Sequence, residues 1–490
     1  MLNIIKNHAQ QAPSRIALQA NSSADFSYAQ LAAEIEAARE KMQDFGNATV
    51  ALALDNSAAW VVLDIAALTN ATPLVPLPHF FSDAQFKHAV LNAGASVLIT
   101  DNPERFARIF ADVISHKSTL HVADKMLMQL QLNIAQKKLP KNTAKITYTS
   151  GTTGTPKGVC LDAEAMQNVA RSVQQLVNLN AQNQHLCVLP LSTLLENVAG
   201  VYATLRAGGT AHIWPSAAVG MTGSALDVQK LHAALQQTQA NTAIFIPELL
   251  GALVLACEAG AAKLPQLRFL AVGGAHVSPS LLQRANALGL PVFEGYGLSE
   301  SASVVALNTP NANKIGSAGK PLPHLKIQFS SENEILVKGA NYLAYTTQTE
   351  EAHEWLATGD IGYLDDDGFL FINGRKKNIF ITSFGRNVSP EWVERDLTSA
   401  ASIAQACVFG EAKPWNVAII TTKPGAASSL LAGDIAQINQ HLPDYARITK
   451  WLLADAPFSV ANGQLTPNGR LKRDAIGQMY QDKINALYTN

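Results

Sequence analysis

Cysteine is scarce in this chain, and neither sign of charge is in excess. Four cysteines occur among 490 residues, at positions 160, 187, 257 and 407, without the short spacings of metal ligands. The 37 basic and 38 acidic residues leave a formal net charge of −1, which gives no general field for nucleic acid or an anionic membrane. The composition therefore favours a protein of the reducing cytoplasm that does not bind nucleic acid.

Long apolar runs are also lacking. Residues 1–13 have no apolar core of the kind that a secretory signal needs. The longest apolar stretch, residues 243–257, is interrupted by Pro247 and Glu248 and is too short to cross a bilayer. With 48% apolar and 15% charged residues, the sequence predicts a globular protein with more than one core and no transmembrane segment. It gives no indication of the oligomeric state.

Helical and strand patterns alternate along the first part of the chain. Residues 27–46 predict a helix, with Leu31, Ile35, Ala38 and Met42 on one stripe. Alternation with short connections predicts parallel sheets covered on both faces by helices, and we expect two such layered sheets. The other expected helices are residues 58–68 and 82–92, and the expected strands are residues 49–54, 72–77, 96–100, 186–190, 210–214, 242–246, 267–272 and 291–294.

The pattern changes near Ile315 to short strands separated by turn signals. Residues 326–329, 334–338 and 368–372 predict a small β-unit, and the basic residues 374–378 close it. The predicted fold class is therefore α/β, with a large N-terminal domain of two layered α/β sheets plus this β-unit. A small, mobile α+β domain follows. We place the two domains at residues 1–374 and 375–490.

One segment constrains the function more than any other. It lies between two predicted strands, residues 144–148 and 159–161, and its glycines allow close backbone approach. Its hydroxyls and amides can donate to phosphate oxygens, and its lysine adds a positive charge, so it predicts a phosphate-binding loop. A glycine follows the lysine, unlike the loop of kinases and GTPases. A flexible linker is the alternative, which the flanking apolar segments oppose. The segment is Thr149-Ser150-Gly151-Thr152-Thr153-Gly154-Thr155-Pro156-Lys157-Gly158.

Four further segments follow in order. Taken singly, each has a structural alternative: a turn after a strand, a strand-end tyrosine beside a solvated glutamate, or a plain turn. Together they supply an aromatic face, hydroxyls, two carboxylates and a guanidinium. They are Gly273-Gly274-Ala275, Glu294-Gly295-Tyr296-Gly297-Leu298-Ser299-Glu300, Thr358-Gly359-Asp360 and Arg375.

In order and spacing, the five segments resemble those of adenylate-forming enzymes: acyl-CoA synthetases, nonribosomal-peptide adenylation domains and luciferases. Fatty acyl-CoA synthetases are the most similar branch. The resemblance implies ATP, Mg²⁺ and, as co-substrate, CoA. It implies that Tyr296 packs on adenine, that Asp360 and Arg375 hold the ribose, and that Lys377 is the hinge between the domains. It assigns Mg²⁺ to Thr149 and Glu300, catalysis to Lys157 and Glu300, and nucleotide contacts to Thr149, Ser150, Gly151, Thr152, Thr153, Gly154, Lys157, Gly274, Ala275, Glu294, Gly295, Tyr296, Gly297, Ser299, Asp360 and Arg375.

The chain departs from the family pattern in two places. The family's last motif puts a catalytic lysine after a Pro-x-x-Gly turn, whereas here Arg470 follows Gly469 and Lys472 comes two residues later. Either Arg470 substitutes, or Lys472 acts instead, or adenylate formation is impaired. In the loop beside the thiol tunnel, Ser383-Phe384-Gly385, a small residue is usual at the second position, and Phe384 is expected to narrow the tunnel. Neutral drift explains both departures equally well.

The expected substrate is a small-molecule carboxylic acid. Residues 189–196 resemble the substrate segment of long-chain acyl-CoA synthetases, with Thr193 where histidine is more usual. The helix at residues 198–205 is mostly small or aliphatic, and no buried carboxylate is evident that would pair with an amino group. A medium- or long-chain fatty acid or a similar apolar acid is therefore favoured, although a plain core helix explains the same residues.

The leading hypothesis is thus an AMP-forming acid–thiol ligase that transfers the acyl group to CoA. Three alternatives remain open from the sequence. The acceptor is instead the thiol of an acyl carrier protein; the adenylate of a hydroxy acid closes to a β-lactone; or the protein is a catalytically weak nucleotide- or acyl-binding protein.

Overall fold

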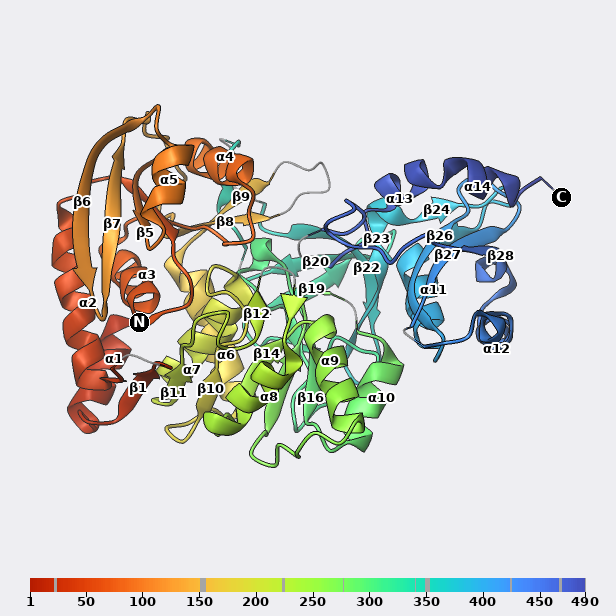
Figure 1. Cartoon of the computed structure of the whole chain (residues 1–490), viewed down its shortest axis with the longest axis horizontal. Coiled ribbons are helices and arrows are strands. Elements are labelled where there is room, and N and C mark those ends of the chain that lie inside the picture. Colours follow the sequence, from red (N-terminus) through yellow and green to blue (C-terminus); the bar gives the residue numbers. More distant parts are fainter. Residues whose placement is uncertain are drawn as a thin grey trace.

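The computed structural model describes residues 1–21, 24–149, 156–222, 225–275, 277–339, 341–348, 353–423, 425–466 and 469–489. Two apolar clusters run from Leu2 to Leu370 and two others from Phe380 to Ile484. Figure 1 shows the corresponding lobes side by side, with the C-terminal lobe in blue. The predicted α/β class, with a large N-terminal and a small C-terminal domain, is confirmed. The boundary at residue 374 stays a prediction.

The first large sheet is mixed. Its four central strands, β8, β4, β3 and β5, are parallel, and antiparallel strands flank them on both sides. The helices that belong to this part of the chain are α2 (Tyr28–Gln43), α3 (Ala58–Asn70), α4 (Asp83–Ala93) and α5 (Pro103–Ile109). The strand order is β21 (Ala344–Tyr345), β9 (Lys157–Leu161), β8 (Lys145–Thr149), β4 (Leu74–Pro76), β3 (Thr49–Ala53), β5 (Ala95–Thr100), β7 (Lys125–Leu132) and β6 (Ile114–Val122).

The second large sheet positions most of the cleft. Its central strands β16, β15, β14, β10, β11 and β1 run parallel. The strand order is β18 (Lys320–Pro321), β17 (Ala306–Leu307), β16 (Val292–Tyr296), β15 (Phe269–Val272), β14 (Thr242–Phe245), β10 (Gln184–Leu186), β11 (Thr210–His212), β1 (Ile16–Gln19) and β2 (Phe26–Ser27). The associated helices are α1 (Leu2–Gln11), α6 (Ala163–Val177), the π-helix η1 (Leu195–Tyr202), α7 (Ala203–Arg206), α8 (Val228–Gln237), α9 (Pro247–Glu258) and α10 (Pro279–Ala287), and β12 (Met221–Thr222) pairs with β13 (Ala225–Leu226).

Local signals explain where several helices begin. Ser27 caps α2 and Ser82 caps α4, and each serine forms a reciprocal capping box with a glutamine three residues later. The predicted helices at residues 27–46, 58–68 and 82–92 are therefore present within a few residues. The predicted helix at 198–205 is also present, as the end of η1 followed by α7.

The predicted strand at residues 186–190 is wrong beyond its first residue. β10 ends at Leu186, because the Glu196 carboxylate accepts the backbone N–H groups of Val188 (3.2 Å) and Leu189 (2.9 Å). Pro190 has no N–H to donate. The chain therefore leaves the sheet and turns into η1. The long hairpin β6–β7 was not predicted.

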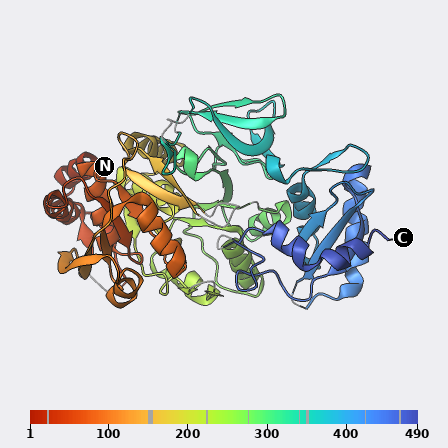
Figure 2. The same cartoon turned by 90° about the horizontal axis from the view of Figure 1, so that it is seen from above.

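The small β-unit is a four-stranded antiparallel sheet, and in Figure 2 it stands above the rest of the molecule in teal. Its order is β19 (Lys326–Phe329), β20 (Glu334–Lys338), β22 (Leu356–Leu364) and β23 (Leu370–Arg375). The first two strands match the predicted bounds. The register between β22 and β23 pairs Asp360 with Arg375 across the two strands, so that two predicted site residues become neighbours.

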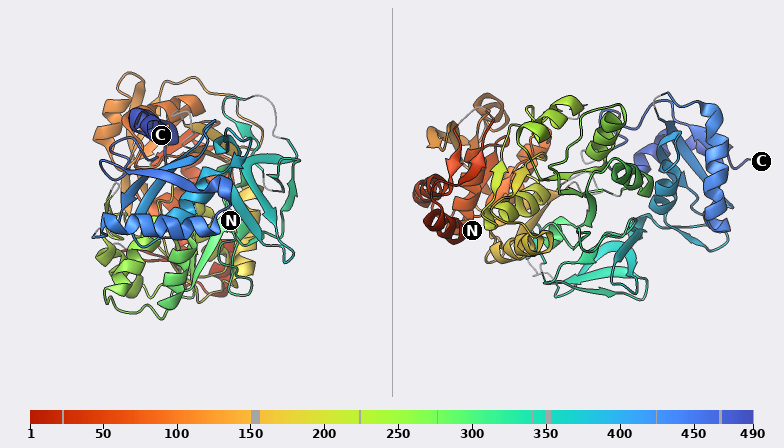
Figure 3. Two further views of the ribbon diagram at one scale, coloured as in Figure 1. Left: turned by 90° about the vertical axis from the view of Figure 1, so that its right-hand side faces the viewer. Right: turned by 90° about the horizontal axis from the view of Figure 1, so that it is seen from below.

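The C-terminal lobe is a three-stranded sheet with helices on both faces (Figure 3). One face packs on α11 and α12, and the other packs on α13 and α14. A short hairpin, β24–β25, precedes α11. The elements are β24 (Phe380–Ile381), β25 (Asn387–Val388), α11 (Pro390–Thr398), β26 (Ile403–Phe409), β27 (Asn416–Thr422), α12 (Leu431–His441), β28 (Ile448–Leu453), α13 (Arg473–Met479) and α14 (Gln481–Ala486), with short 3-10 turns at Ser299–Ser301 (η2), Lys376–Asn378 (η3), Ser428–Leu430 (η4) and Asp444–Ala446 (η5). Within the described ranges, none of the helices is long and apolar enough to span a bilayer.

His212 on β11 makes the stability of the N-terminal lobe dependent on pH. Burial, helped by the nearby His185, lowers the pKa of His212 from 6.5 to about 4. The unfolded chain therefore binds a proton at a higher pH than the folded chain does. The stability is complete above pH 6.5 and is lost as the pH falls towards the folded pKa.

We expect this loss to be about 2 kcal/mol between pH 6.5 and pH 5, since each pH unit contributes about 1.4 kcal/mol in that window. Urea unfolding at both pH values measures it in the parent, in His212→Gln and in the exposed control His116→Gln. The parent and the control should lose this stability, whereas His212→Gln should lose about 2 kcal/mol less. Equal pH dependence in all three proteins would contradict the assignment.

Candidate active site

A continuous cleft of about 2250 Å³ lies where the second large sheet, the β-unit and the C-terminal lobe meet. The carboxyl ends of parallel strands β14, β15 and β16 open into it, the edge where ligands bind in open α/β sheets. Among the predicted site residues, the cleft is lined by Gly274, Ala275, Glu294, Gly295, Tyr296, Gly297, Ser299, Glu300, Asp360, Arg375, Lys377, Arg470 and Lys472.

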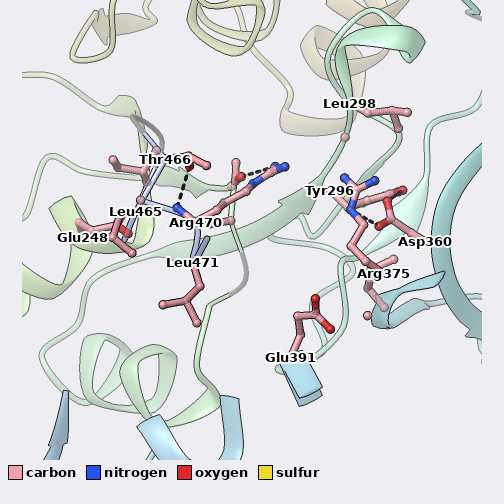
Figure 4. Close-up of a pocket in the computed structure, with 18 of the residues that line it drawn as sticks. Glu248, Tyr296, Leu298, Asp360, Arg375, Glu391, Leu465, Thr466, Arg470 and Leu471 are labelled. Carbon is pink, nitrogen blue, oxygen red and sulfur yellow. Dashed lines mark hydrogen bonds and ion pairs between the residues drawn. The ribbon is translucent and has the colours of Figure 1, made fainter. Parts of the chain in front are cut away.

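Asp360 joins two of these residues directly. The Tyr296 hydroxyl donates to one carboxylate oxygen of Asp360 at 2.5 Å, and Arg375 Nε lies 2.8 Å from the other oxygen. Arg375 Nη1 also donates to the Thr358 carbonyl at 3.2 Å. Burial raises the pKa of Asp360, and the Arg375 charge and the Tyr296 hydrogen bond oppose this rise. Figure 4 shows the three side chains together on one side of the cleft.

The glycines beside Tyr296 are required by close backbone approach. A Cβ at Gly297 would lie 1.6 Å from the Ser303 carbonyl oxygen, so no side chain fits there. Gly274 has φ +83°, a left-handed conformation that favours glycine. The strand ends therefore present bare backbone, and the Gly274 carbonyl points to the cleft.

Arg470 reaches that carbonyl from the C-terminal lobe. Its Nη2 donates to Gly274 O at 2.9 Å, and its backbone N–H donates to Thr466 Oγ1 at 3.0 Å (Figure 4). Gly469 packs so tightly on Glu248 of α9 that a Cβ there would lie 2.5 Å from Glu248 Oε1. Pro467 and Asn468 lie outside the described residues. Lys472 directly precedes α13, where its N–H donates to Gln464 O at 2.8 Å. In this arrangement Arg470 hydrogen-bonds across the two lobes, next to the contact of Gly469 with Glu248.

Several cations meet in the cleft. The pKa of Arg470 is lowered by enclosure in the cleft and by the positive charge of Arg375, although its side chain remains exposed to the cleft. Burial lowers the pKa of Lys377 as well, with Arg375 and Arg470 contributing. Like charges held this close repel one another until an anion joins them, so the geometry favours an anionic ligand.

Glu300 and Lys157 both lie close to Tyr345. The Tyr345 hydroxyl donates to Glu300 Oε1 at 2.8 Å, and Lys157 Nζ lies 5.7 Å from the centre of the same ring. Lys157 begins β9 and pairs with Thr149 at the end of β8. The predicted loop residues Ser150, Gly151, Thr152, Thr153 and Gly154 lie outside the described residues, as does the side chain of Thr149.

The described part of the chain holds no cluster of three or more histidine, cysteine or acidic side chains that could bind a metal. The second carboxylate oxygen of Glu300 is a suitable Mg²⁺ ligand when phosphate oxygens complete the shell. Glu294, in contrast, is buried, and burial raises its pKa to about 8. It therefore carries little charge at neutral pH.

The predicted thiol loop lies away from the cleft lining. Ser383, Phe384 and Gly385 form the turn of the β24–β25 hairpin, where the Ser383 N–H donates to Lys413 O at 3.0 Å. Phe384 is 75% exposed at this turn, and its expected effect on a thiol tunnel stays a prediction. Lys377 lies in η3, between β23 and the C-terminal lobe, as expected for a residue near the junction.

Sequence reasoning missed two residues that line the cleft and one buried residue behind it. Tyr345 and Glu248 reach it through contacts with distant parts of the chain, for which no local pattern exists. Glu196 is a fully buried carboxylate, bonded to His185, where the sequence suggested none. The only sequence signal for Glu196 was its closeness in the chain to Leu189, whose backbone N–H it accepts.

Comparison with known proteins follows this geometry. The AMP-binding enzyme family matches residues 5–341, and the AMP-binding enzyme C-terminal domain matches residues 377–490. A long-chain-fatty-acid–CoA ligase of Mycobacterium bovis is 28% identical over 515 aligned positions, covering 88% of this chain and 86% of that protein. A 2-succinylbenzoate–CoA ligase of Bacillus licheniformis is 29% identical, covering 84% and 87%.

Solved structures show the same fold. The o-succinylbenzoate CoA synthetase of Bacillus subtilis, in complex with its acyl-adenylate, has a TM-score of 0.78 at 24% identity and covers 97% of each chain. The same enzyme with ATP and a magnesium ion has a TM-score of 0.76 at 24% identity, over 96% of this chain and 98% of that one. The prediction of ATP, Mg²⁺ and CoA agrees with these names and complexes.

The predicted superfamily and the predicted class, an acid–thiol ligase, are confirmed by these relatives. Because the larger match alone spans most of the chain and the second continues it to the C-terminus, the protein belongs to the AMP-binding enzyme family.

Proposed function

We propose that the protein activates an apolar carboxylic acid with ATP and transfers the acyl group to the thiol of CoA. The observation that carries this proposal is the meeting of Arg470 with the Gly274 carbonyl, opposite the Tyr296–Asp360–Arg375 cluster. A nucleotide bound at that cluster would place its phosphates among Arg470, Lys157 and Glu300.

In the first half-reaction, the acid's carboxylate attacks the α-phosphate, forming an acyl-adenylate and releasing pyrophosphate. The chain's own part is positioning and charge neutralisation. Tyr296 would pack on the adenine, and Asp360 and Arg375 would hold the ribose. Lys157, with the loop ahead of it, would hold the β- and γ-phosphates. Glu300 would ligate Mg²⁺ through its second carboxylate oxygen, with Thr149 as the second predicted ligand.

In the second half-reaction, a thiol attacks the adenylate carbonyl and AMP leaves. The Ser383–Gly385 turn does not line the cleft in this arrangement, although its hydrogen-bond partner Lys413 does, so a rotation near Lys377 would be needed to bring the turn into the cleft. We place the domain boundary at residues 374 and 375, next to this hinge.

An apolar acid is supported by the cleft's lining beneath Gly273, where Leu195, Ala199, Ile244 and Ala271 contribute. The buried Glu196 does not offer a partner for an amino group, because His185 and two backbone N–H groups occupy its oxygens. One observation favours a carrier protein as the acceptor instead: Phe384 is exposed at the hairpin turn, where a protein surface can cover it.

Mass spectrometry of one incubation with ATP, Mg²⁺, CoA and a panel of acids tests the proposal. We expect acid-dependent pyrophosphate together with an acyl-CoA product, and loss of both in Lys157→Ala. If an acyl carrier protein is acylated in preference to CoA, the acceptor is the carrier protein. If a product with the mass of a β-lactone forms, the second half-reaction is ring closure and not thioester formation. Absence of acid-dependent pyrophosphate from every acid would reject the activity.

Arg470 is expected to act in adenylate formation, and Lys472 is not. Arg470→Ala should lower kcat/KM for pyrophosphate release by roughly 10²–10³, as expected on removing one charge that stabilises the transition state. Arg470→Lys should retain more activity, because it keeps the charge but loses the forked geometry. Lys472→Ala is the matched control and should stay close to the parent. A large fall in Lys472→Ala with none in Arg470→Ala would reverse the assignment.

Of the two substrates, the hydroxyl of Tyr296 is expected to affect the binding of ATP and not that of the acid. Tyr296→Phe keeps the aromatic ring but removes the donor to Asp360, and the KM for ATP should rise roughly 3- to 10-fold, the value of one hydrogen bond. The KM for the acid should stay unchanged. Tyr363→Phe, on an exposed strand of the β-unit, is the control. If both substitutions leave the KM for ATP unchanged, Tyr296 does not orient Asp360 towards the nucleotide.

A further inference from the structure

The lining of the cleft continues down one face of the second large sheet. Neighbouring strands place their side chains in rows: Ile244 is paired with Ala271, and Thr242 is paired with Phe269 on one side and with His185 on the other. The row nearer to Gly273, formed by Ile244 and Ala271, is apolar, and Ala271 has a small side chain. α6 and η1 contribute Val173 and Ala199 from the opposite side.

The far end of this lining is polar. Three of its residues, His185, Thr204 and Thr242, carry hydrogen-bonding side chains although they are buried. Asn183 Nδ2 donates to Thr204 Oγ1 at 3.1 Å and to Thr242 Oγ1 at 3.3 Å. A hydrogen bond of 3.1 Å joins Thr242 Oγ1 and His185 Nδ1. Two hydroxyls are thus oriented by an amide and an imidazole behind them.

A carboxylate supports this group from behind. His185 Nε2 lies 2.7 Å from Glu196 Oε1, while Glu196 Oε2 accepts the N–H groups of Val188 and Leu189. A Cβ at Gly200 would lie 2.5 Å from both Glu196 Oε1 and His185 Nε2, so η1 is shaped around the pair. Both oxygens of Glu196 are hydrogen-bonded and Glu196 lies behind His185, so the polar groups that reach the lining here are the His185 imidazole and the two threonine hydroxyls.

Buried polar side chains destabilise an apolar site unless they find partners. Each threonine hydroxyl can donate one hydrogen bond and accept two, and Thr204 uses one acceptor position for Asn183. The two hydroxyls therefore keep capacity for a further partner, and a neutral group of a bound ligand is suited to them.

The distance from Gly273 to this polar end of the lining follows from the number of strand residues between them. Gly273, beside the Arg470 contact, is four residues beyond Phe269, which is level with Thr242. Four residues of strand span about 13 Å. An extended alkyl chain covers this distance with about ten carbons, given C–C bonds of ~1.5 Å.

We propose, building on the proposed function, that the acid activated by this protein is of medium length and carries a hydroxyl or carbonyl group near the end remote from its carboxylate. Thr204 and Thr242 are the specificity-determining residues that bind this group. Asn183 and the His185–Glu196 pair are positioning residues that act through the two threonines.

Paired substrates test the specificity. Pyrophosphate release with ω-hydroxydecanoic acid is compared with release with decanoic acid, and kcat/KM should favour the hydroxy acid roughly tenfold. Thr204→Val and Thr242→Val remove one hydroxyl each with little change of shape, and each should bring the ratio towards one. Thr204→Ser keeps the hydroxyl and should therefore keep the preference of the parent for the hydroxy acid. Thr210→Val is the matched control, a buried threonine on β11 of the same sheet that is not part of the lining.

Binding separates this inference from the proposed function. The dissociation constants of ω-hydroxydecanoyl and decanoyl sulfamoyladenosine, which imitate the two adenylates, are measured for the parent and the four variants. Thermal melting shows which variants are folded. A parent preference for the hydroxylated analogue that disappears in the two valine variants supports the inference, even if no acid yields pyrophosphate. A parent that binds the decanoyl analogue equally well or better, or a ratio unchanged in both valine variants, overturns it. Absence of pyrophosphate from any acid, with the binding preference intact, would count against catalysis alone.

Discussion

The carboxylate of Asp360 is the interaction on which the arrangement of the cleft depends. It accepts the hydroxyl of Tyr296 from the second large sheet and binds the guanidinium of Arg375 from the neighbouring strand of the β-unit. Removing a partner from such a nearly buried carboxylate leaves its charge uncompensated, which is strongly destabilising. The contact therefore fixes the β-unit against the sheet at the point where β23 leads into η3 and the C-terminal lobe.

The same contact arranges charge for a ligand. Arg375 neutralises Asp360, but Arg470 and Lys377 add further positive charge nearby, and the pKa values of both are lowered in part by Arg375. Asp360, Glu300, Glu391 and Asp474 offset part of this charge. The remaining repulsion among Arg375, Arg470 and Lys377 is reduced when an anionic ligand binds between them, so a phosphate-bearing ligand is favoured there. Nucleotide binding and closure of the C-terminal lobe would then support each other.

Much of this fold could be predicted because its signals are local. The strands at 326–329 and 334–338 have the predicted bounds, since alternation and turn residues define them. Ser27 and Ser82 mark the starts of their helices. Gly273 and Gly297 follow the ends of β15 and β16, and the close approach of the Ser303 carbonyl requires glycine at position 297. Membership of the family followed from these segments taken together.

The failures have a common physical cause, which is contact between residues far apart in sequence. The hydrogen bond from Arg470 to the Gly274 carbonyl joins residues far apart in the chain, and the pairing of β21 with β9 brings Tyr345 to Glu300. The early end of β10 depends on a side chain, because Glu196 takes N–H groups that a longer strand would have given to its neighbour.

The hydrogen bonds that Glu196 accepts also explain why η1 is a π-helix. Glu196 must reach back to the N–H groups of Val188 and Leu189 and also bond to His185, and both groups occupy the space that a side chain at Gly200 would need. A wider helical turn with glycine at its inner face accommodates them, and π-helical turns of this kind recur at functional sites. An apolar residue in place of Glu196 would let β10 continue and would remove the reason for the wide turn. The geometry of the cleft beside η1 therefore follows from one buried carboxylate, Glu196, as its geometry beside the β-unit follows from another, Asp360.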